Sequence, residues 1–141
     1  MTQETKRIPA SELAYMRDGL HHLDGQPFTG IAFNLAKDGS LKSELAYRDG
    51  LLWGRTKEWY TTGQPMVDST YYMGALHGRA SEWHRNGQLA EDGEYEYGIT
   101  LWEKMWDEHG NVTRDVALKE SDPAYQMLLN YRRVYGGDPA A

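Results

Sequence analysis

The sequence repeats with a period of 24 residues, which restricts the fold to stacked copies of one small unit. Glycines recur at this spacing in three columns, at positions 30, 54 and 78, at 39, 63 and 87, and at 50, 74 and 98. Apolar residues form three further columns with the same period: Leu35, Trp59 and Trp83; Tyr47, Tyr71 and Tyr95; Phe28, Leu52 and Leu76. A unit this short cannot bury an apolar face alone, so successive copies are expected to pack against one another.

Each unit is predicted to be a β-hairpin. Asp38-Gly39, Asn86-Gly87 and His109-Gly110 separate extended segments, and such pairs favour tight hairpin turns because these turns require positive φ. Glycines 50, 74 and 98 are expected to turn one hairpin into the next. In the fourth unit one residue is missing before Trp106, and Trp102 stands where a glycine is expected. The predicted strands span residues 31–36, 41–47, 55–60, 65–72, 79–84, 89–96, 102–107 and 112–117.

The repeats are expected to occupy residues 25–118 of a single domain. Residues 1–24 carry a degenerate half-unit, because ELAYMRDG at 12–19 echoes ELAYRDG at 44–50. Residues 119–141 are predicted to form a helix and a tail, with Pro123 in the first turn of the helix. Stacked hairpins leave an open last edge, which this helix is expected to cover. The predicted fold is mainly β, an antiparallel β-hairpin repeat solenoid with a C-terminal capping α-helix.

Side-chain alternation separates the two faces of the predicted sheet. Ile31, Phe33 and Leu35 share a face with the Trp59 and Trp83 column, so this face is expected to be the core. The tryptophan ladder of Trp59, Trp83 and Trp106 also resembles a stacking platform for bases or sugars, but regular stacking favours a core role. The opposite face is polar and suited to solvent or a partner, since it carries Thr56, Glu58, Tyr60, Ala80, Glu82 and His84.

The composition limits the classes of partner. A formal net charge of -6 disfavours nucleic acid and anionic membranes and favours a basic protein partner. There are no cysteines and there is no apolar run long enough to span a bilayer, so we expect a cytoplasmic protein. The oligomeric state is left open.

No catalytic constellation stands out in the sequence. Glu58 and Glu82 form one carboxylate column, and Glu44, Asp68 and Asp92 form another. Stacked like charges can raise a pKa far enough for acid–base chemistry, but a solvated acidic face is the simpler interpretation. The spacing of the five histidines suits no metal site, and no phosphate-binding glycine loop is present. The sequence therefore predicts a protein that is not an enzyme and has neither cofactor nor metal.

The order of residues within each unit resembles the bacterial MORN-variant repeat over residues 25–118. The shared pattern is Gly, a strand ending in an aromatic residue such as Trp59 or Trp83, Asn-Gly or Thr-Gly, a polar strand, Tyr and Gly. This repeat is typical of small proteins grouped as antitoxin components of toxin–antitoxin systems. The resemblance implies a β-hairpin solenoid that acts by binding protein and neutralises a toxin.

The predicted function is that of an antitoxin or immunity-type protein whose repeat face binds a basic toxin or effector. The alternative is a structural scaffold that self-associates through its repeat edges. Trp53 is the candidate for an exposed binding anchor, because the equivalent positions hold unrelated residues and tryptophan is enriched at interface hot spots. The complete set of predicted protein-binding residues is Trp53, Glu58, Tyr60, His77, Glu82 and His84.

Overall fold

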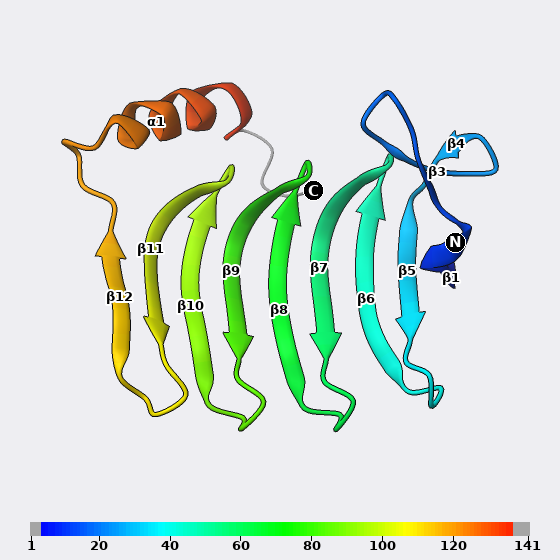
Figure 1. The fold of residues 1–141 in the computed structure, drawn as a ribbon. Coiled ribbons are helices and arrows are strands. Elements are labelled where there is room, and N and C mark those ends of the chain that lie inside the picture. Colours follow the sequence, from blue (N-terminus) through cyan, green and yellow to red (C-terminus); the bar gives the residue numbers. More distant parts are fainter. Residues whose placement is uncertain (1–3, 137–141) are drawn as a thin grey trace.

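The computed structural model describes residues 4–136, most of which form one long sheet in which consecutive strands pair (Figure 1). The prediction of a mainly β fold with consecutive antiparallel hairpins and a C-terminal helix is confirmed. Eight strands follow one another in sequence order, and a short N-terminal strand is added at one edge. In spatial order the strands are β1 (Arg7–Pro9), β5 (Gly30–Leu35), β6 (Leu41–Arg48), β7 (Leu51–Trp59), β8 (Pro65–Tyr72), β9 (Ala75–Trp83), β10 (Leu89–Glu96), β11 (Ile99–Trp106) and β12 (Val112–Ala117).

Two kinds of turn alternate along the sheet. The tight two-residue turns are Asp49-Gly50, Met73-Gly74 and Tyr97-Gly98, in which both residues have positive φ, as type I′ hairpins require. The glycines expected to join one hairpin to the next therefore do so. Asp38-Gly39, Asn86-Gly87 and His109-Gly110 do connect antiparallel strands as predicted, but not in type I′ turns, since only the glycine of each pair has positive φ.

The other turns are longer loops with a shared hydrogen-bond pattern. In the first of them, Gly39 N donates to Ala36 O and Ala36 N donates to Ser40 O. The same pair of bonds recurs at residues 60–64, 84–88 and 107–111, and also at 16–20 in the N-terminal region. The long loops lie at one end of the strands and the tight turns between repeats lie at the other (Figure 1).

Two of the periodic glycines lie inside strands instead of before them. β7 and β9 begin at Leu51 and Ala75, four residues earlier than expected, and Gly54 and Gly78 adopt φ values of +98° and +108° beside irregularities in the ladder. Such bulges bend a strand and are favoured by glycine. In β11 (Ile99–Trp106) the missing residue shortens the strand. Trp102 pairs with Glu94 directly beside an irregularity in the ladder, but its φ is not positive.

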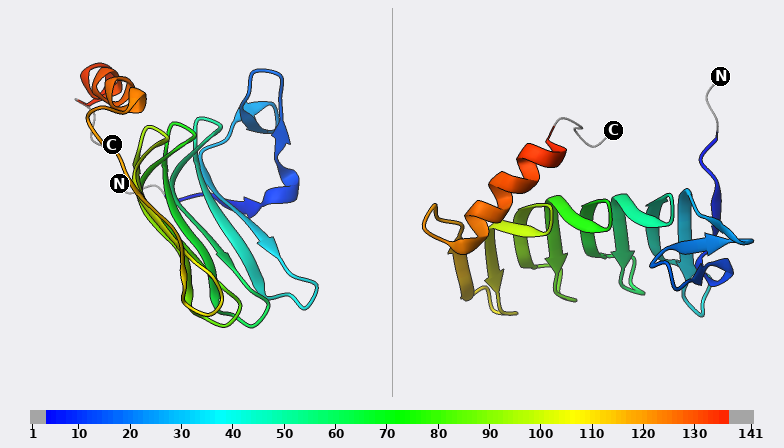
Figure 2. Two further views of the ribbon diagram at one scale, coloured as in Figure 1. Left: turned by 60° about the vertical axis from the view of Figure 1, so that its left-hand side comes forward. Right: turned by 90° about the horizontal axis from the view of Figure 1, so that it is seen from above.

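The N-terminal region supplies the best-buried core of the molecule. β1 pairs parallel to β5, and the short helix η1 (Ala10–Glu12) follows it. A small sheet comes next, made of β2 (Ala14–Tyr15), β3 (His21–Leu23) and β4 (Gln26–Pro27), which lies at the opposite end of the sheet from the C-terminal helix (Figures 1 and 2). The buried apolar cluster here consists of Ile8, Phe28, Ala32 and Tyr47.

The prediction of the core face is wrong. The face that carries Ile31, Phe33 and Leu35 also carries Arg55 and Arg79, which form ion pairs with Asp68 and Asp92, and Leu35 is 54% exposed. The tryptophans at 59, 83 and 106 are only half-buried. Charged side chains occupy most of this face from β7 onward, which leaves too little apolar surface for a core. We call it the ion-pair face, defined by the pairs Arg7–Glu44, Arg55–Asp68 and Arg79–Asp92.

The C-terminal helix does not cover the last strand, contrary to expectation. α1 (Pro123–Tyr135) lies over the tight-turn end of the sheet, where Arg132 Nε donates to Glu96 Oε2 at 2.6 Å and Tyr131 and Tyr135 contact Tyr97 (Figure 1). Every residue of β12 is exposed. The predicted tail after the helix lies outside the described residues, and no helix within residues 4–136 is long and apolar enough to span a membrane.

Candidate functional site

The polar face of the sheet is built from three adjacent rows of side chains. Strand register places tyrosines in the first row, at 47, 71 and 95, opposite glycines 30, 54 and 78. Short side chains form the second row, where Thr56, Ser69 and Ala80 pair across β7, β8 and β9. The third row runs Glu58, Val67, Glu82 and Glu91 across β7 to β10. We call this the acidic face, defined by Glu58, Glu82 and Glu91.

The short middle row leaves a hollow between the tyrosines and the carboxylates. Its volume is about 170 Å³, and Tyr71, Tyr95 and the three glutamates line it above a floor that includes Ser69. Thr56 and Ser69 are buried between the larger side chains of the two flanking rows. The hollow is therefore a small acidic depression with aromatic walls.

Two of the carboxylates face each other without a cation between them. Glu82 and Glu91 are direct cross-strand partners, and like charges at such positions destabilise a sheet. None of the ion pairs within residues 4–136 includes Glu58, Glu82 or Glu91. The arginines of β7 and β9 project from the other face, and Arg114 of β12, which lies on this face, is paired with Glu103.

A shared proton relieves part of this repulsion. Burial, a hydrogen bond to Glu103 and the charge of Glu82 raise the pKa of Glu91 to about 7. The pKa of Glu103 is lowered by that same hydrogen bond and by Arg114, whose Nε donates to Glu103 Oε2 at 2.7 Å. Below a pH of about 7, Glu91 therefore holds the proton of this pair and Glu103 carries the charge. A cation brought close to Glu91 would favour release of this proton.

The tyrosines stay protonated and act as hydrogen-bond donors. Burial raises the pKa of Tyr95, with a further contribution from Glu103, to which the Tyr95 hydroxyl donates at 3.2 Å. Burial and the charges of Glu58 and Glu82 raise the pKa of Tyr71. An ammonium or guanidinium group in this hollow would contact carboxylate oxygens and aromatic ring faces together, which is a favourable environment for a cation.

Replacing Glu91 with glutamine is expected to stabilise the protein at alkaline pH. The folded-state pKa is near 7 and the unfolded value near 4.5, so the unfolded state releases its proton first and stability falls as pH rises between these values. Allowing for solvent screening, the loss amounts to about 1–2 kcal/mol by pH 8. Urea unfolding at pH 5 and pH 8 should show this slope in the wild type and not in Glu91→Gln. The raised pKa of Glu91 would be contradicted if Glu91→Gln kept the same dependence of stability on pH. It would also be contradicted if the exposed control Glu108→Gln lost this dependence to the same extent.

The six predicted binding residues do not form one site. Glu58 and Glu82 lie together in the acidic hollow, and the rings of Trp53 and His77 both contact Tyr72. Trp53 and His77 lie toward the tight-turn end, where an aromatic row continues through Tyr72 and Tyr97 to the helix. Trp53 is half-buried instead of exposed, with the Arg48 guanidinium 4.6 Å from its ring. The indole Nε1 is buried without a hydrogen-bond partner among the described residues. A binding role for Trp53 stays a prediction.

Tyr60 and His84 connect one repeat to the next. The Tyr60 hydroxyl donates to Trp83 O at 2.6 Å, and His84 Nε2 lies 2.8 Å from Trp106 O. His77 has a related role at the other end of the strands, where its Nδ1 accepts from Tyr97 N at 3.0 Å. These side chains are engaged within the fold, so their first role is to hold successive hairpins in register.

Replacing Tyr60 with phenylalanine is therefore expected to destabilise the protein by about 1 kcal/mol, the usual net loss for one hydrogen bond. The half-buried Trp83 carbonyl would lose its donor, while the aromatic packing would remain. Urea unfolding measures the change, and Tyr15→Phe is the control because Tyr15 is 70% exposed. Equal free energies of unfolding for the two variants would show that the hydrogen bond from Tyr60 to the next repeat does not contribute to stability.

Sequence reasoning missed Glu91, Tyr71 and Tyr95 as members of the site. The tyrosine column follows from the repeat, but its period alone does not show which face of the sheet it occupies. Glu91 occupies a column with Ser43 and Val67, so no periodic carboxylate marks it. Counting outward from the Asn86-Gly87 turn does place Glu91 opposite Glu82, and this cross-strand count was the available signal.

The site offers binding chemistry. Within residues 4–136 no group of three or more His, Cys, Asp or Glu side chains is arranged to hold a metal ion. The acidic hollow is lined by carboxylate and phenol groups, and Ser69 contributes a hydroxyl group at its base. This combination is suited to recognising a positively charged side chain.

Comparisons with known proteins identify the repeat. Residues 76–97 match the model of the MORN repeat variant. Over 112 residues the chain is 42% identical to "Immunity protein YwqK" of Bacillus subtilis (strain 168), an alignment that covers 79% of this chain and 73% of that protein. A crystal structure of accessory secretory protein 1, 2 and 3 in Streptococcus pneumoniae aligns with 96% of this chain and 28% of that chain, with 12% identity and a TM-score of 0.36.

Proposed function

The chain carries a MORN repeat variant and belongs to the family of immunity protein YwqK, and on this basis we propose that it is an immunity-type antitoxin that neutralises a toxin by direct binding. The name of the relative supports a role in immunity and a role other than catalysis. We extend both to this chain, and we propose that it acts in the cytoplasm as a solenoid-like binding surface.

The choice of binding surface rests on one observation: among the described residues, no ion pair includes any member of the carboxylate row Glu58, Glu82 and Glu91. Glu82 is exposed and directly opposite Glu91, while Glu58 lies in the same row two strands away. A lysine or arginine from a partner would supply the missing charge. The cation of the partner would attract the carboxylates and reduce the repulsion between them. The net charge of -6 would also increase the rate at which a basic partner associates.

A second candidate function is self-association as a scaffold, which the open edge at β12 favours. All six residues of this strand are exposed, and an edge strand without cover can pair with another chain. Sedimentation over a micromolar concentration range distinguishes the two functions. A monomer throughout removes the scaffold, whereas oligomers that grow with concentration support it.

Co-purification from the native host tests the antitoxin proposal. Tagged protein would be recovered at about 50 mM and about 500 mM salt, because exposed charge pairs weaken as ionic strength rises. We expect one basic protein in stoichiometric amount at low salt and less at high salt. Expression of that protein alone should arrest growth, and co-expression with this chain should restore it. No stoichiometric partner, or a partner whose toxicity this chain leaves unchanged, would contradict the proposal.

A further inference from the structure

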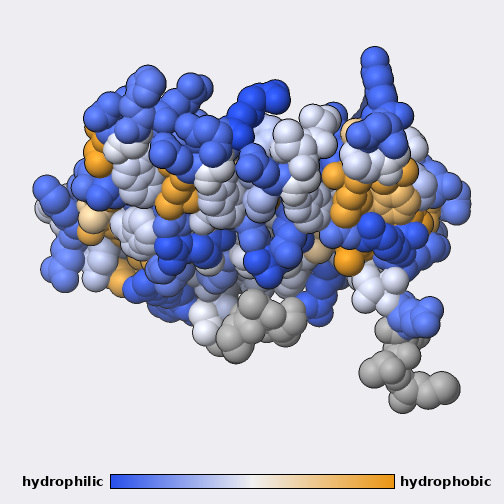
Figure 3. All heavy atoms as spheres, turned by 90° about the horizontal axis from the view of Figure 1, so that it is seen from below, coloured by the Kyte–Doolittle hydropathy of each residue, from blue (hydrophilic) through white to orange (hydrophobic). Residues whose placement is uncertain are grey.

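A groove at the long-loop end of the sheet lies apart from the acidic hollow. It has a volume of about 580 Å³ and lies between the β5–β6 loop and the end of β7, with Leu35, Leu41, Trp59 and Met66 among its apolar residues. In Figure 3, which views this end of the molecule, hydrophobic surface gathers where β5 and β6 lie. The volume is within the range of pockets that bind a small ligand or a few side chains.

The groove exists because the first repeat departs from the pattern of the others. Trp59-Tyr60 and Trp83-His84 are replaced here by Leu35-Ala36. Tyr60 and His84 each reach the main-chain carbonyl of a tryptophan in the next repeat, at 2.6 and 2.8 Å. Ala36 has no side-chain donor with which to reach the equivalent carbonyl of Trp59. The smaller pair thus leaves a gap beside Trp59 that is lined by apolar side chains.

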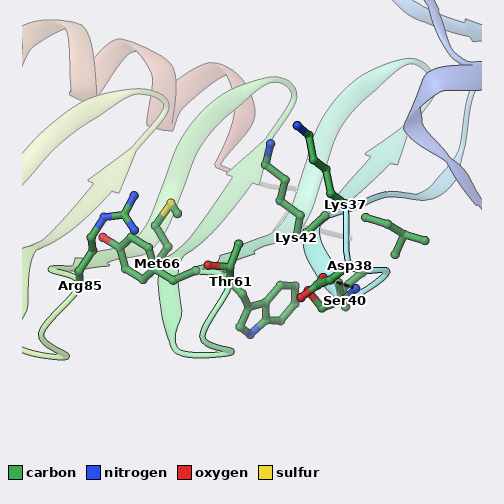
Figure 4. A pocket seen from close by; sticks show the side chains of 12 residues that line it. Lys37, Asp38, Ser40, Lys42, Thr61, Met66 and Arg85 are labelled. Atoms are coloured by element: carbon green, nitrogen blue, oxygen red, sulfur yellow. Dashed lines mark hydrogen bonds between the residues drawn. The ribbon is translucent and has the colours of Figure 1, made fainter.

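The charge around this gap is opposite to that of the acidic hollow. Lys37, Lys42 and Arg85 line the groove, and Figure 4 shows the two lysines projecting on the same side, with Arg85 and Met66 across from them. None of the ion pairs formed within residues 4–136 includes any of the three cations. The carboxylate of Asp38 in the same loop is held by Ser40, through bonds of 2.9 Å from the amide and 2.6 Å from the hydroxyl.

We propose that this groove binds an extended acidic peptide segment of a partner protein, with one apolar side chain in the gap beside Leu35 and Ala36 and carboxylates at Lys37, Lys42 and Arg85. The apolar part of the groove takes the anchor residue, and the three cations select acidic neighbours on either side of it. A main-chain amide of the peptide then replaces the donor that Tyr60 and His84 supply in later repeats. This surface is separate from the acidic face, so it stands even if the antitoxin proposal fails.

The test uses a defined probe, the peptide acetyl-Glu-Asp-Leu-Glu-Asp-amide, titrated into the ¹⁵N-labelled full chain at low salt. We expect amide shifts confined to residues 35–42 and 59–61 and to the loop at Arg85, with a Kd below about 1 mM. Lys37→Gln combined with Lys42→Gln should weaken binding about 5- to 10-fold, as expected for two partly exposed charges. The control with the same change in charge is Lys6→Gln combined with Lys119→Gln, two exposed lysines that do not line the groove, and it should bind the peptide as the wild type does.

A second variant tests the gap itself. Ala36→Tyr places in the first repeat the side chain that occupies the equivalent position in the second, so it should fill the groove and abolish peptide binding without lowering the melting temperature. Three outcomes would overturn the proposal: equal binding of the neutral peptide acetyl-Gln-Asn-Leu-Gln-Asn-amide, shifts located elsewhere, or unchanged binding by Ala36→Tyr. Self-association that Ala36→Tyr abolishes would also overturn it, because the occupant would then be a second copy of the chain.

Discussion

Replacing Glu82 with lysine is expected to weaken binding of the neutralised toxin by about 2–4 kcal/mol, roughly 30- to 700-fold. Glu82 is exposed at the centre of the carboxylate row, with Val67 and Glu91 as its cross-strand neighbours. A lysine at this position would form an attractive pair with Glu91 and place its own ammonium group against the incoming cation. The variant therefore removes an attraction and adds a repulsion at the same place. Isothermal titration with the co-purified partner measures the change.

The control for this experiment is Glu120→Lys, which changes the net charge by the same amount. Glu120 is exposed in the segment before the C-terminal helix, away from the hollow. We expect this variant to alter mainly the association rate at low salt, since a distant charge affects steering more than the bound contacts. Equal losses of affinity in the two variants would mean that net charge, and not the acidic face, accounts for binding.

Replacing Gly30 with alanine is expected to destabilise the protein by about 3–5 kcal/mol. Gly30 has a φ of +149°, and a Cβ added there would lie 2.4 Å from the Lys6 carbonyl oxygen and 2.8 Å from Phe28 Cζ. The Lys6 carbonyl accepts from Ile31 N at 2.8 Å, so displacing it would break the join between β1 and β5. Phe28 belongs to the buried N-terminal cluster and has little room to move. Thermal unfolding should show a midpoint about 10 °C or more below that of the wild type.

Gly63→Ala is the control for Gly30→Ala, because it introduces the backbone strain of positive φ without steric crowding of the new Cβ. Gly63 also has positive φ, but a Cβ added there would meet nothing within 4 Å. The expected cost is therefore only the strain of a left-handed residue, about 1–2 kcal/mol. If Gly30→Ala unfolded at the same temperature as Gly63→Ala, the join between β1 and the repeats would not contribute to stability as described.

The repeat period predicted the order of the strands because it directly reports a structural unit. Glycines 50, 74 and 98 each end one unit. A chain of hairpins joined at these glycines is therefore expected, and this expectation does not depend on the conformation of the other loops. The type of each turn was harder to predict. Met73-Gly74 and Tyr97-Gly98 form type I′ turns although methionine and tyrosine rarely adopt positive φ. Asn86-Gly87 has the favoured composition but lies in the longer loop.

The core face was predicted wrongly because most of the buried row in the middle strands is not hydrophobic. Ser43, Thr56 and Ser69 are buried by the tyrosines and glutamates on either side, and their small polar side chains give no hydrophobic signal. Ile31 and Phe33 do alternate as a core strand would, but only in the first repeat. The position of the C-terminal helix also could not be predicted, since its apolar residues are equally compatible with covering an edge strand or the ends of the turns.

Zero-length carbodiimide cross-linking of the chain to its co-purified partner tests the central claim most directly. The reagent joins carboxylates to lysine amines that are already in contact, so the cross-linked peptides show which face carries the partner. If the acidic face binds the toxin, links should form through Glu58, Glu82 or Glu91, and excess salt should suppress them. Links confined to carboxylates outside that face, such as Asp68, Glu94 and Asp115, would contradict the claim.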